Sequence, residues 1–173
     1  MSQLKVNSII PVAGVPTGGG GGIVQIVQDV LDTTASFTSL SYQTQTFTDT
    51  GLSATITPTS TSSKIYVLAT IYHASQASTN TARFNLVRGS TNIAQPANSP
   101  AGSATSINYL NTISMITTPI SFLDSPSTTS ATTYKIQISF DVPGSNITHY
   151  INRYHGADLF NGISTLTLME VSA

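Results

Sequence analysis

The feature that most constrains the fold is a succession of short runs rich in β-branched and aromatic residues, which occupies the chain from Ile23 onward. Clusters of Gly, Pro, Asn and Ser separate these runs, as they separate strands joined by turns. No segment shows the longer apolar period of a helix, and Gly89 is predicted to turn a hairpin within 84–94. The runs predict strands at 23–31, 37–49, 51–57, 64–73, 82–88, 91–95, 106–117, 119–123, 132–141, 147–154 and 163–171.

Apolar and polar residues alternate within several of these runs, which gives a strand one apolar face and one polar, solvent-exposed face. Leu52, Ala54 and Ile56 share a face, and the segments 134–138 and 163–169 alternate in the same way. The run 65–69 is apolar on both faces, which predicts a central strand. Two antiparallel sheets packed face to face account for both patterns, so residues 23–173 are predicted to form one all-β sandwich domain.

The composition limits how such a domain is held together and what it binds. A hydrophobic content of 39% is enough for one core, and without cysteine no disulfide can support it. Only 8% of residues are charged, and the net charge is −1 with no basic stripe, which argues against nucleic-acid binding. The longest apolar run, 64–73, is shorter than the roughly 18 residues of a membrane span. The first residues lack the pattern of a secretory signal, so we expect synthesis in a cytoplasm.

The first 22 residues differ from the rest of the chain. They contain two prolines and end in an unbroken glycine run, 18–22, which is incompatible with a helix interior. The segment is too short to bury a core of its own, so its apolar residues are expected to need a partner surface. We therefore predict that residues 1–22 form an extended attachment arm with a glycine-rich joint. The predicted attachment residues are Leu4, Val6, Ile9, Ile10, Pro11 and Val12.

Few charges are available to protect the edges of the predicted sheets. Lysine is a common defence of sheet edges, and only Lys64 and Lys135 follow the arm. Closed symmetric oligomers cover edges and outer faces in another way. The chain is therefore predicted to form a homo-oligomer.

The richest local cluster of functional side chains lies at 149–155. In a strand, His149 and Arg153 would share one face, and Tyr150 and Tyr154 the other. The two histidines of this segment would then lie roughly 20 Å apart, too far to bind one metal ion together. A metal ion bound on a three-fold axis by one histidine from each subunit is the alternative, and ordinary packed or solvated histidines are favoured over it. Tyr150, Arg153 and Tyr154 are candidate surface-binding residues for a sugar, with plain interface packing as the alternative. Tyr109 is a weaker candidate.

Known catalytic patterns are missing from the sequence. The glycine run 18–22 lacks the Gly-Lys-Ser/Thr of a phosphate loop, and no Gly-x-Ser-x-Gly elbow occurs. Glycoside cleavage needs two acidic residues across a cleft, and Glu170 is the single glutamate of the chain. Asp124 and Asp141 are interpreted as turn residues beside prolines. We expect no enzyme activity and no catalytic, cofactor-binding or metal-binding residues.

An ordered series of motifs resembles a family of marine and cyanophage virion proteins. The series begins with Leu-Lys-Val-Asn at 4–7 and Ile-Val-Gln-Ile-Val-Gln at 23–28. It continues with the segment 47–67, which begins Phe-Thr-Asp-Thr-Gly-Leu-Ser-Ala-Thr-Ile-Thr-Pro, and then with 84–94 and 122–137. The likeness covers nearly the whole chain, and the segments 95–106 and 141–161 fit the shared pattern least well.

Proteins of this type are described as tail-fibre or virion structural proteins. The resemblance implies a jelly-roll-like sandwich that forms a trimer on a phage particle, docks onto other virion proteins through its arm, and faces the host surface, with a host surface glycan as a candidate ligand. A capsid decoration or head-fibre protein with a purely structural role is the first alternative. A host-polysaccharide depolymerase is the second, and the shortage of acidic residues argues against it.

Overall fold

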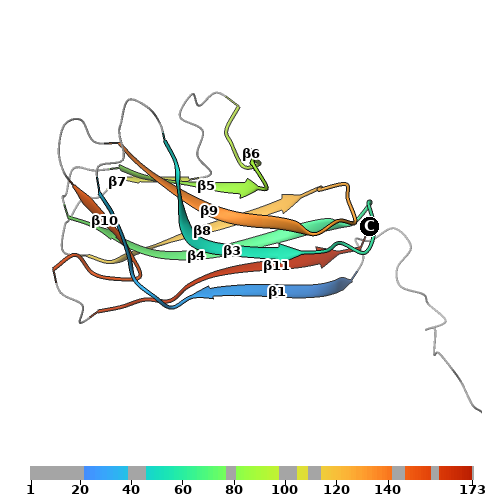
Figure 1. Ribbon diagram of the computed structural model, residues 1–173, viewed down its shortest axis with the longest axis horizontal. Helices are drawn as coiled ribbons and strands as arrows, with labels where there is room; N and C mark the ends of the chain where they lie inside the picture. Colours follow the sequence, from blue (N-terminus) through green and yellow to red (C-terminus); the bar gives the residue numbers. More distant parts are fainter. Residues whose placement is uncertain are drawn as a thin grey trace, which may run out of the picture.

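The computed structural model describes residues 22–38, 46–76, 81–97, 105–108, 114–141, 147–156 and 160–172. All regular structure in these ranges is β-strand, and no helix that could cross a membrane occurs in them. Figure 1 shows the strands as two stacked layers. The strands are β1 (Ile23–Leu31), β2 (Ala35–Thr38), β3 (Thr48–Ile56), β4 (Lys64–Ser75), β5 (Thr81–Arg88), β6 (Thr91–Asn92), β7 (Thr105–Asn108), β8 (Ile116–Asp124), β9 (Thr132–Asp141), β10 (Thr148–Ile151) and β11 (Ser164–Val171).

The first layer, sheet A, is built around β4. Strand β11 pairs with β4 on one side and β8 pairs with it on the other, while β1 pairs with the far side of β11. His73 of β4 faces both Ile116 of β8 and Ile151 of β10, so β10 lies on the same side of β4 as β11. Strand β2 pairs with β10 as β1 pairs with β11. All pairs are antiparallel, and the sheet is four strands wide.

The second layer, sheet B, has β9 and β5 at its centre. Strand β3 pairs with β9, and β9 pairs with β5. The far side of β5 pairs with β7 near Thr81 and with β6 near Arg88. The predicted antiparallel two-sheet sandwich is therefore confirmed, with β4 as the predicted central strand.

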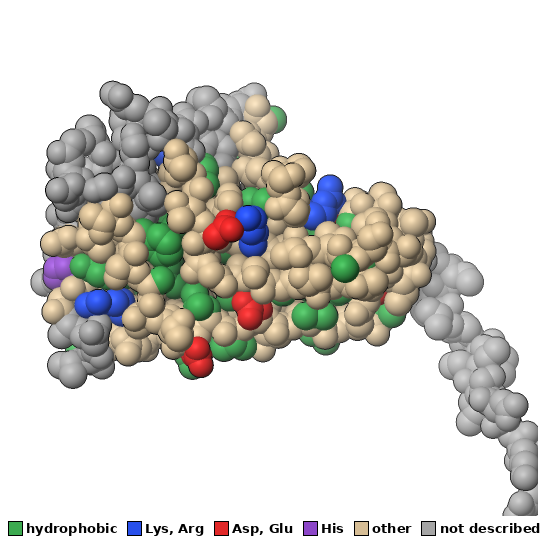
Figure 2. All heavy atoms as spheres, viewed as in Figure 1, with side chains coloured by type: hydrophobic (Ala, Val, Ile, Leu, Met, Phe, Trp, Pro, Cys, Tyr) green, Lys and Arg blue, Asp and Glu red, His purple; other side chains and the backbone are tan. Residues whose placement is uncertain are grey.

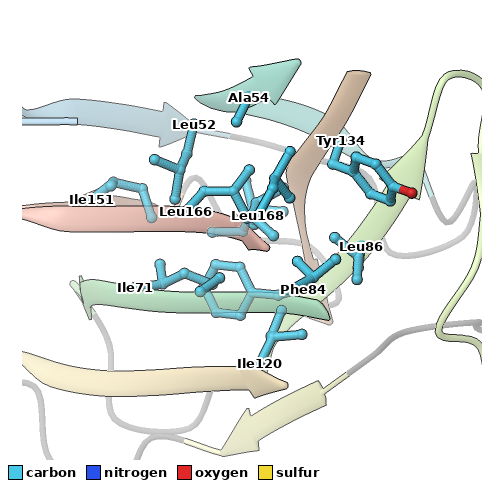
Figure 3. Packing of buried hydrophobic residues seen from close by; sticks show 14 of the residues in the cluster. Leu52, Ala54, Ile71, Phe84, Leu86, Ile120, Tyr134, Ile151, Leu166 and Leu168 are labelled. Carbon is cyan, nitrogen blue, oxygen red and sulfur yellow. The ribbon is translucent and has the colours of Figure 1, made fainter. Parts of the chain in front are cut away.

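The core lies between the two sheets and consists of the faces predicted from the alternation. Leu52, Ala54 and Ile56 point inward from β3, and Leu166 and Leu168 point inward from β11. Figure 3 shows side chains from both sheets converging on this space, with Phe84 and Ile71 near its middle. Each large buried side chain of this kind stabilises the fold by about 1.5–3 kcal/mol.

The structure corrects two predicted strand breaks. A break was expected between 37–49 and 51–57, but β3 continues through Gly51, which has a φ of 94° within a register shift between Asp49 and Ser53. Glycine allows this bulge because it carries no Cβ. A second break was expected before Pro119, but β8 runs unbroken through it. Among the described strands β8 pairs only with β4, and such an edge strand tolerates a missing N–H.

Three further predictions have a clear outcome. The hairpin at Gly89 is confirmed, with a φ of 58° at the glycine and Arg88 paired with Thr91. The strand predicted at 91–95 is shorter, because β6 ends at Asn92. The strand predicted at 147–154 ends at Ile151, since Asn152 has a positive φ of 60°.

Candidate surface-binding site at the distal end

The predicted binding segment lies at one end of the sandwich, and Gly22 and Ser172, the first and last residues that the structure describes, lie at the other, here called the terminal end. At the terminal end, the backbone N–H of Ser172 donates to the carbonyl of Gly22 over 3.3 Å. At the opposite, distal end, Leu31 is paired with Ser164, the first residue of β11 (Figure 1). The eight residues of β11 separate the two ends by roughly 26 Å.

Asn152 is the buried junction that positions the distal end. Its side-chain amide nitrogen donates to the carbonyls of Leu31 (2.6 Å) and Thr33 (3.0 Å). Its side-chain oxygen accepts a hydrogen bond from the Ser164 hydroxyl over 2.6 Å, and that hydroxyl in turn accepts from the backbone N–H of Tyr72. Asparagine tolerates the left-handed backbone found here better than most residues do. The chain therefore turns away from sheet A directly after β10.

The segment after Asn152 folds back on itself. The N–H of Tyr154 donates to the carbonyl of Phe160 over 3.1 Å, and the N–H of Gly162 donates to the carbonyl of Asn152 over 3.0 Å. Gly162 lies so close to Tyr72 that a Cβ at this position would approach the tyrosine Cβ to 2.7 Å. These contacts fix the path of the chain on both sides of the turn.

The resulting distal cluster consists of Tyr150, Arg153, Tyr154, His155 and Phe160. The guanidinium carbon of Arg153 lies 4.7 Å from the centre of the Tyr150 ring, a cation–π distance. The Tyr154 ring makes edge-to-face contacts with His155 at 5.3 Å and with Phe160 at 6.2 Å. Phe160 is 67% exposed. The cluster therefore presents aromatic surface and one cation to solvent.

This arrangement corrects the predicted strand faces. Arg153 was expected beside His149, but it packs on Tyr150 because the turn at Asn152 ends the strand alternation. The three candidates Tyr150, Arg153 and Tyr154 are nevertheless neighbours. Phe160 was not predicted, because its approach to Tyr154 depends on the fold of the turn, and an exposed aromatic residue in a loop was its only sequence signal.

The histidine at the start of this segment has a different role. His149 is fully buried, as is His73 on the neighbouring strand, and the His73 ring lies 4.7 Å edge-to-face from Phe84. His73 Nε2 shares a hydrogen bond of 2.7 Å with the Thr118 hydroxyl. The pKa of both histidines is lowered to about 3, mainly by burial and, for His73, also by the neighbouring His149. Both are neutral near pH 7, so the interpretation of His149 as a packed histidine is confirmed.

Two buried acids at the terminal end were not recognised in the sequence. Glu170 accepts hydrogen bonds from Gln25 Nε2 (2.6 Å) and from the N–H and hydroxyl of Thr59 (2.7 Å each). Burial raises the pKa of this carboxyl, but hydrogen bonds from Gln25, Thr59 and Ser63 outweigh burial and lower the pKa to about 2. Such a carboxylate stays ionised near pH 7 and is poorly suited to transfer protons.

Asp124 is the second buried acid, and it joins the two sheets. Its carboxylate accepts from Arg88 at 2.7 Å and from the Tyr134 hydroxyl at 2.7 Å. Burial, followed by the neighbouring Asp124, raises the pKa of Tyr134 above its ordinary value. The interpretation of Asp124 as a turn residue therefore missed its main contacts. Neither acid offers a free catalytic group.

Other parts of the predicted site fall outside the described residues. These are Tyr109 and the attachment residues Leu4, Val6, Ile9, Ile10, Pro11 and Val12. In the part of the chain that the structure describes, no three His, Cys, Asp or Glu residues are grouped closely enough to hold a metal ion. A groove of about 470 Å³ runs between 93–96 and 119–122, without contact to the distal cluster.

Charged side chains are sparse on the molecular surface. Figure 2 shows a face covered mostly by backbone and uncharged side chains, with a few acidic and basic groups, one pair of which is in contact. Neither a scan against models of protein families nor a search of curated proteins gives a match to the chain.

Proposed function

We propose that the protein is a structural component of a phage virion, a tail fibre or tail-associated module. In this proposal residues 1–22 attach the protein to other virion proteins, and the distal cluster faces outward. The single observation that carries the proposal is that Gly22, where the arm joins the sandwich, lies at the opposite end of β11 from the distal cluster. A protein displayed on a particle needs this separation between attachment and contact surfaces.

The order of the strands supports a jelly-roll description. Sheet A has the order β1-β11-β4-β8, and sheet B has the order β3-β9-β5-β7. With the short strands β2, β6 and β10 left aside, the chain alternates between two sets of four strands, which matches the connectivity of a jelly roll, an architecture common in viral capsid and lectin domains. Architecture alone does not assign a function. The proposal therefore depends mainly on the separation between Gly22 and the distal cluster.

Contact with the host surface is proposed to be non-covalent. Tyrosine rings offer flat faces for sugar rings, and the Arg153 guanidinium offers several hydrogen-bond donors to hydroxyls. Weak single contacts gain strength when several linked copies bind together. The proposed assembly is a homotrimer, and the proposed ligand class is a host surface glycan.

Two variants test the two halves of the proposal. Deleting residues 2–17 is expected to leave a folded protein that no longer enters virions, as measured by the protein content of purified particles. Normal incorporation of the deletion variant would refute the arm assignment.

Replacing Tyr150 and Arg153 by alanine is expected to reduce adsorption of virions to host cells while the protein content of the particles is unchanged. Thr55→Ala, on an exposed position of β3 far from the cluster, is the control.

A further inference from the structure

The outer face of sheet A carries an apolar row that crosses the whole sheet. The strand registers place Ile26 of β1, Met169 of β11, Tyr66 of β4 and Leu123 of β8 next to one another in that order. These residues point away from the core, because their neighbours along each strand are the inward-facing ones. The row therefore runs from one edge of the sheet to the other.

The two residues at the ends of this row are exposed, and the two between them, Met169 and Tyr66, are partly buried. Ile26 is 59% exposed and Leu123 is 50% exposed. Seven large hydrophobic side chains stand out as exposed among the described residues, of which four lie on β1 and one on β8. The apolar surface of the sandwich is thus concentrated on one outer face rather than scattered.

The same face is almost free of charge. Its other outward residues are hydroxyl, amide or apolar side chains, and Lys64 at its border is the only charged residue that β1, β11, β4 and β8 direct outward. Its polar groups pair with one another: Tyr66 with Ser121 over 2.8 Å, and Gln28 with Thr167 over 2.9 Å. Little on this face would attract a charged partner.

We propose that the outward-facing sides of β1, β11, β4 and β8 form the surface through which copies of this chain associate, with the row from Ile26 to Leu123 at the centre of the contact. A charged partner surface would lose its water here without gaining counter-charges, which is costly. A second copy brings the same uncharged surface, and contacts between identical subunits are more apolar than other protein contacts. This inference rests on the proposed oligomer and not on the virion role.

Charge placed on the row tests the contact. The variant Ile26→Glu/Leu123→Glu is expected to reduce the mass measured by light scattering from that of the oligomer to that of one chain. Both side chains are exposed, so the fold is expected to survive. Thr55→Glu, exposed on the outer face of sheet B, is the matched control and is expected to keep the oligomer.

Cysteine cross-linking gives a second, independent readout, because the natural chain has no cysteine. Ile26 and Leu123 lie three strand spacings apart, roughly 14 Å, whereas a disulfide requires Cα atoms within about 7 Å. Any disulfide in Ile26→Cys/Leu123→Cys must therefore join two copies. We expect covalently linked copies from this variant and none from Thr55→Cys.

The outcomes separate the two proposals. If the wild-type chain has the mass of one chain at all concentrations, the proposed oligomer and this inference both fail. If the wild type is an oligomer that neither the glutamate pair nor the cysteine pair affects, this inference alone fails.

Discussion

The two ends of the sandwich bury polar groups of different kinds. At the terminal end, the buried groups are the carboxyl groups of Glu170 and Asp124, and both residues are paired with the same core residue, Ile65, across the sheet. At the distal end the buried groups of sheet A are neutral: the amide of Asn152, the hydroxyl of Ser164, and two uncharged histidines. One end is thus held by charged hydrogen bonds and the other by neutral ones.

This difference indicates how each end can be used. Charged hydrogen bonds are the stronger kind, and those at the terminal end connect β1, β5, β8, β9 and β11 near Gly22. The distal end instead uses its hydrogen bonds to direct one turn outward, with Tyr150 and Arg153 beside it. This difference fits the proposal that the terminal end attaches the protein and that the distal end forms the contact surface.

Acid is expected to have the largest effect and to act on the distal end first. The pKa of His73 and of His149 is about 3 in the folded protein and 6.5 when exposed, so the unfolded chain binds protons first. The stability that these histidines contribute is complete above pH 6.5 and is lost as the pH falls toward 3, at up to about 1.4 kcal/mol per pH unit for each group.

The buried carboxyl group at the terminal end is expected to lose its stabilising contribution at lower pH than the histidines do. The pKa of Glu170 is about 2 when folded and 4.5 when exposed, so its contribution is lost only below pH 4.5. Hydrogen exchange at pH 7 and pH 5.5, corrected for the intrinsic exchange rates, should show weaker protection in β10 before any change in β1. An equal loss of protection in β10 and β1 would contradict the assignment of the acid sensitivity to the two histidines. The variant His149→Gln should reduce the pH dependence of the protection in β10.

Loss of the Asp124 carboxylate should give the next largest effect. Asp124→Ala leaves Arg88 and the buried Tyr134 hydroxyl without their shared acceptor, which is expected to lower the free energy of unfolding by about 3–5 kcal/mol. The control is Asp49→Ala, which removes an exposed ion pair with Lys135 and should cost less than about 1 kcal/mol. Denaturant unfolding measures both. Similar losses of unfolding free energy in the two variants would show that the buried Asp124 stabilises the fold no more than an exposed ion pair does.

A smaller effect is expected from Asn152. Asn152→Ala removes the hydrogen bonds to Leu31, Thr33 and Ser164 and leaves a positive φ that alanine resists, at a cost of about 2–3 kcal/mol. Asn152→Gly relieves the backbone cost, so thermal unfolding should place it between the wild type and the alanine variant. A glycine variant less stable than the alanine variant would contradict this account of the turn.

The sequence predicted the layers of the fold better than its ends. Alternation reports directly which residues share one face of a strand, so the shared apolar face of Leu52, Ala54 and Ile56 was predicted correctly, and all three are buried. The end of β10 was not predictable, because the conformation of Asn152 depends on carbonyls of Leu31 and Thr33, far away in the sequence.

The roles of the buried acids were hidden for the same reason. Glu170 is bound by Thr59, and Asp124 by Arg88, and no local pattern marks either contact. For the proposed binding site, the sequence singled out Tyr150, Arg153 and Tyr154 as candidates, but it placed Arg153 on the opposite strand face from Tyr150 and did not indicate Phe160.

The most direct test of the account is the orientation of the protein on the particle. Single cysteines at the exposed positions Thr34, beside the distal end, and Thr61, beside the terminal end, can each carry a gold label on intact virions, imaged by electron microscopy. The account predicts that the label at Thr34 lies farther from the particle than the label at Thr61. Absence of both labels from virions, or the reverse order, would contradict it.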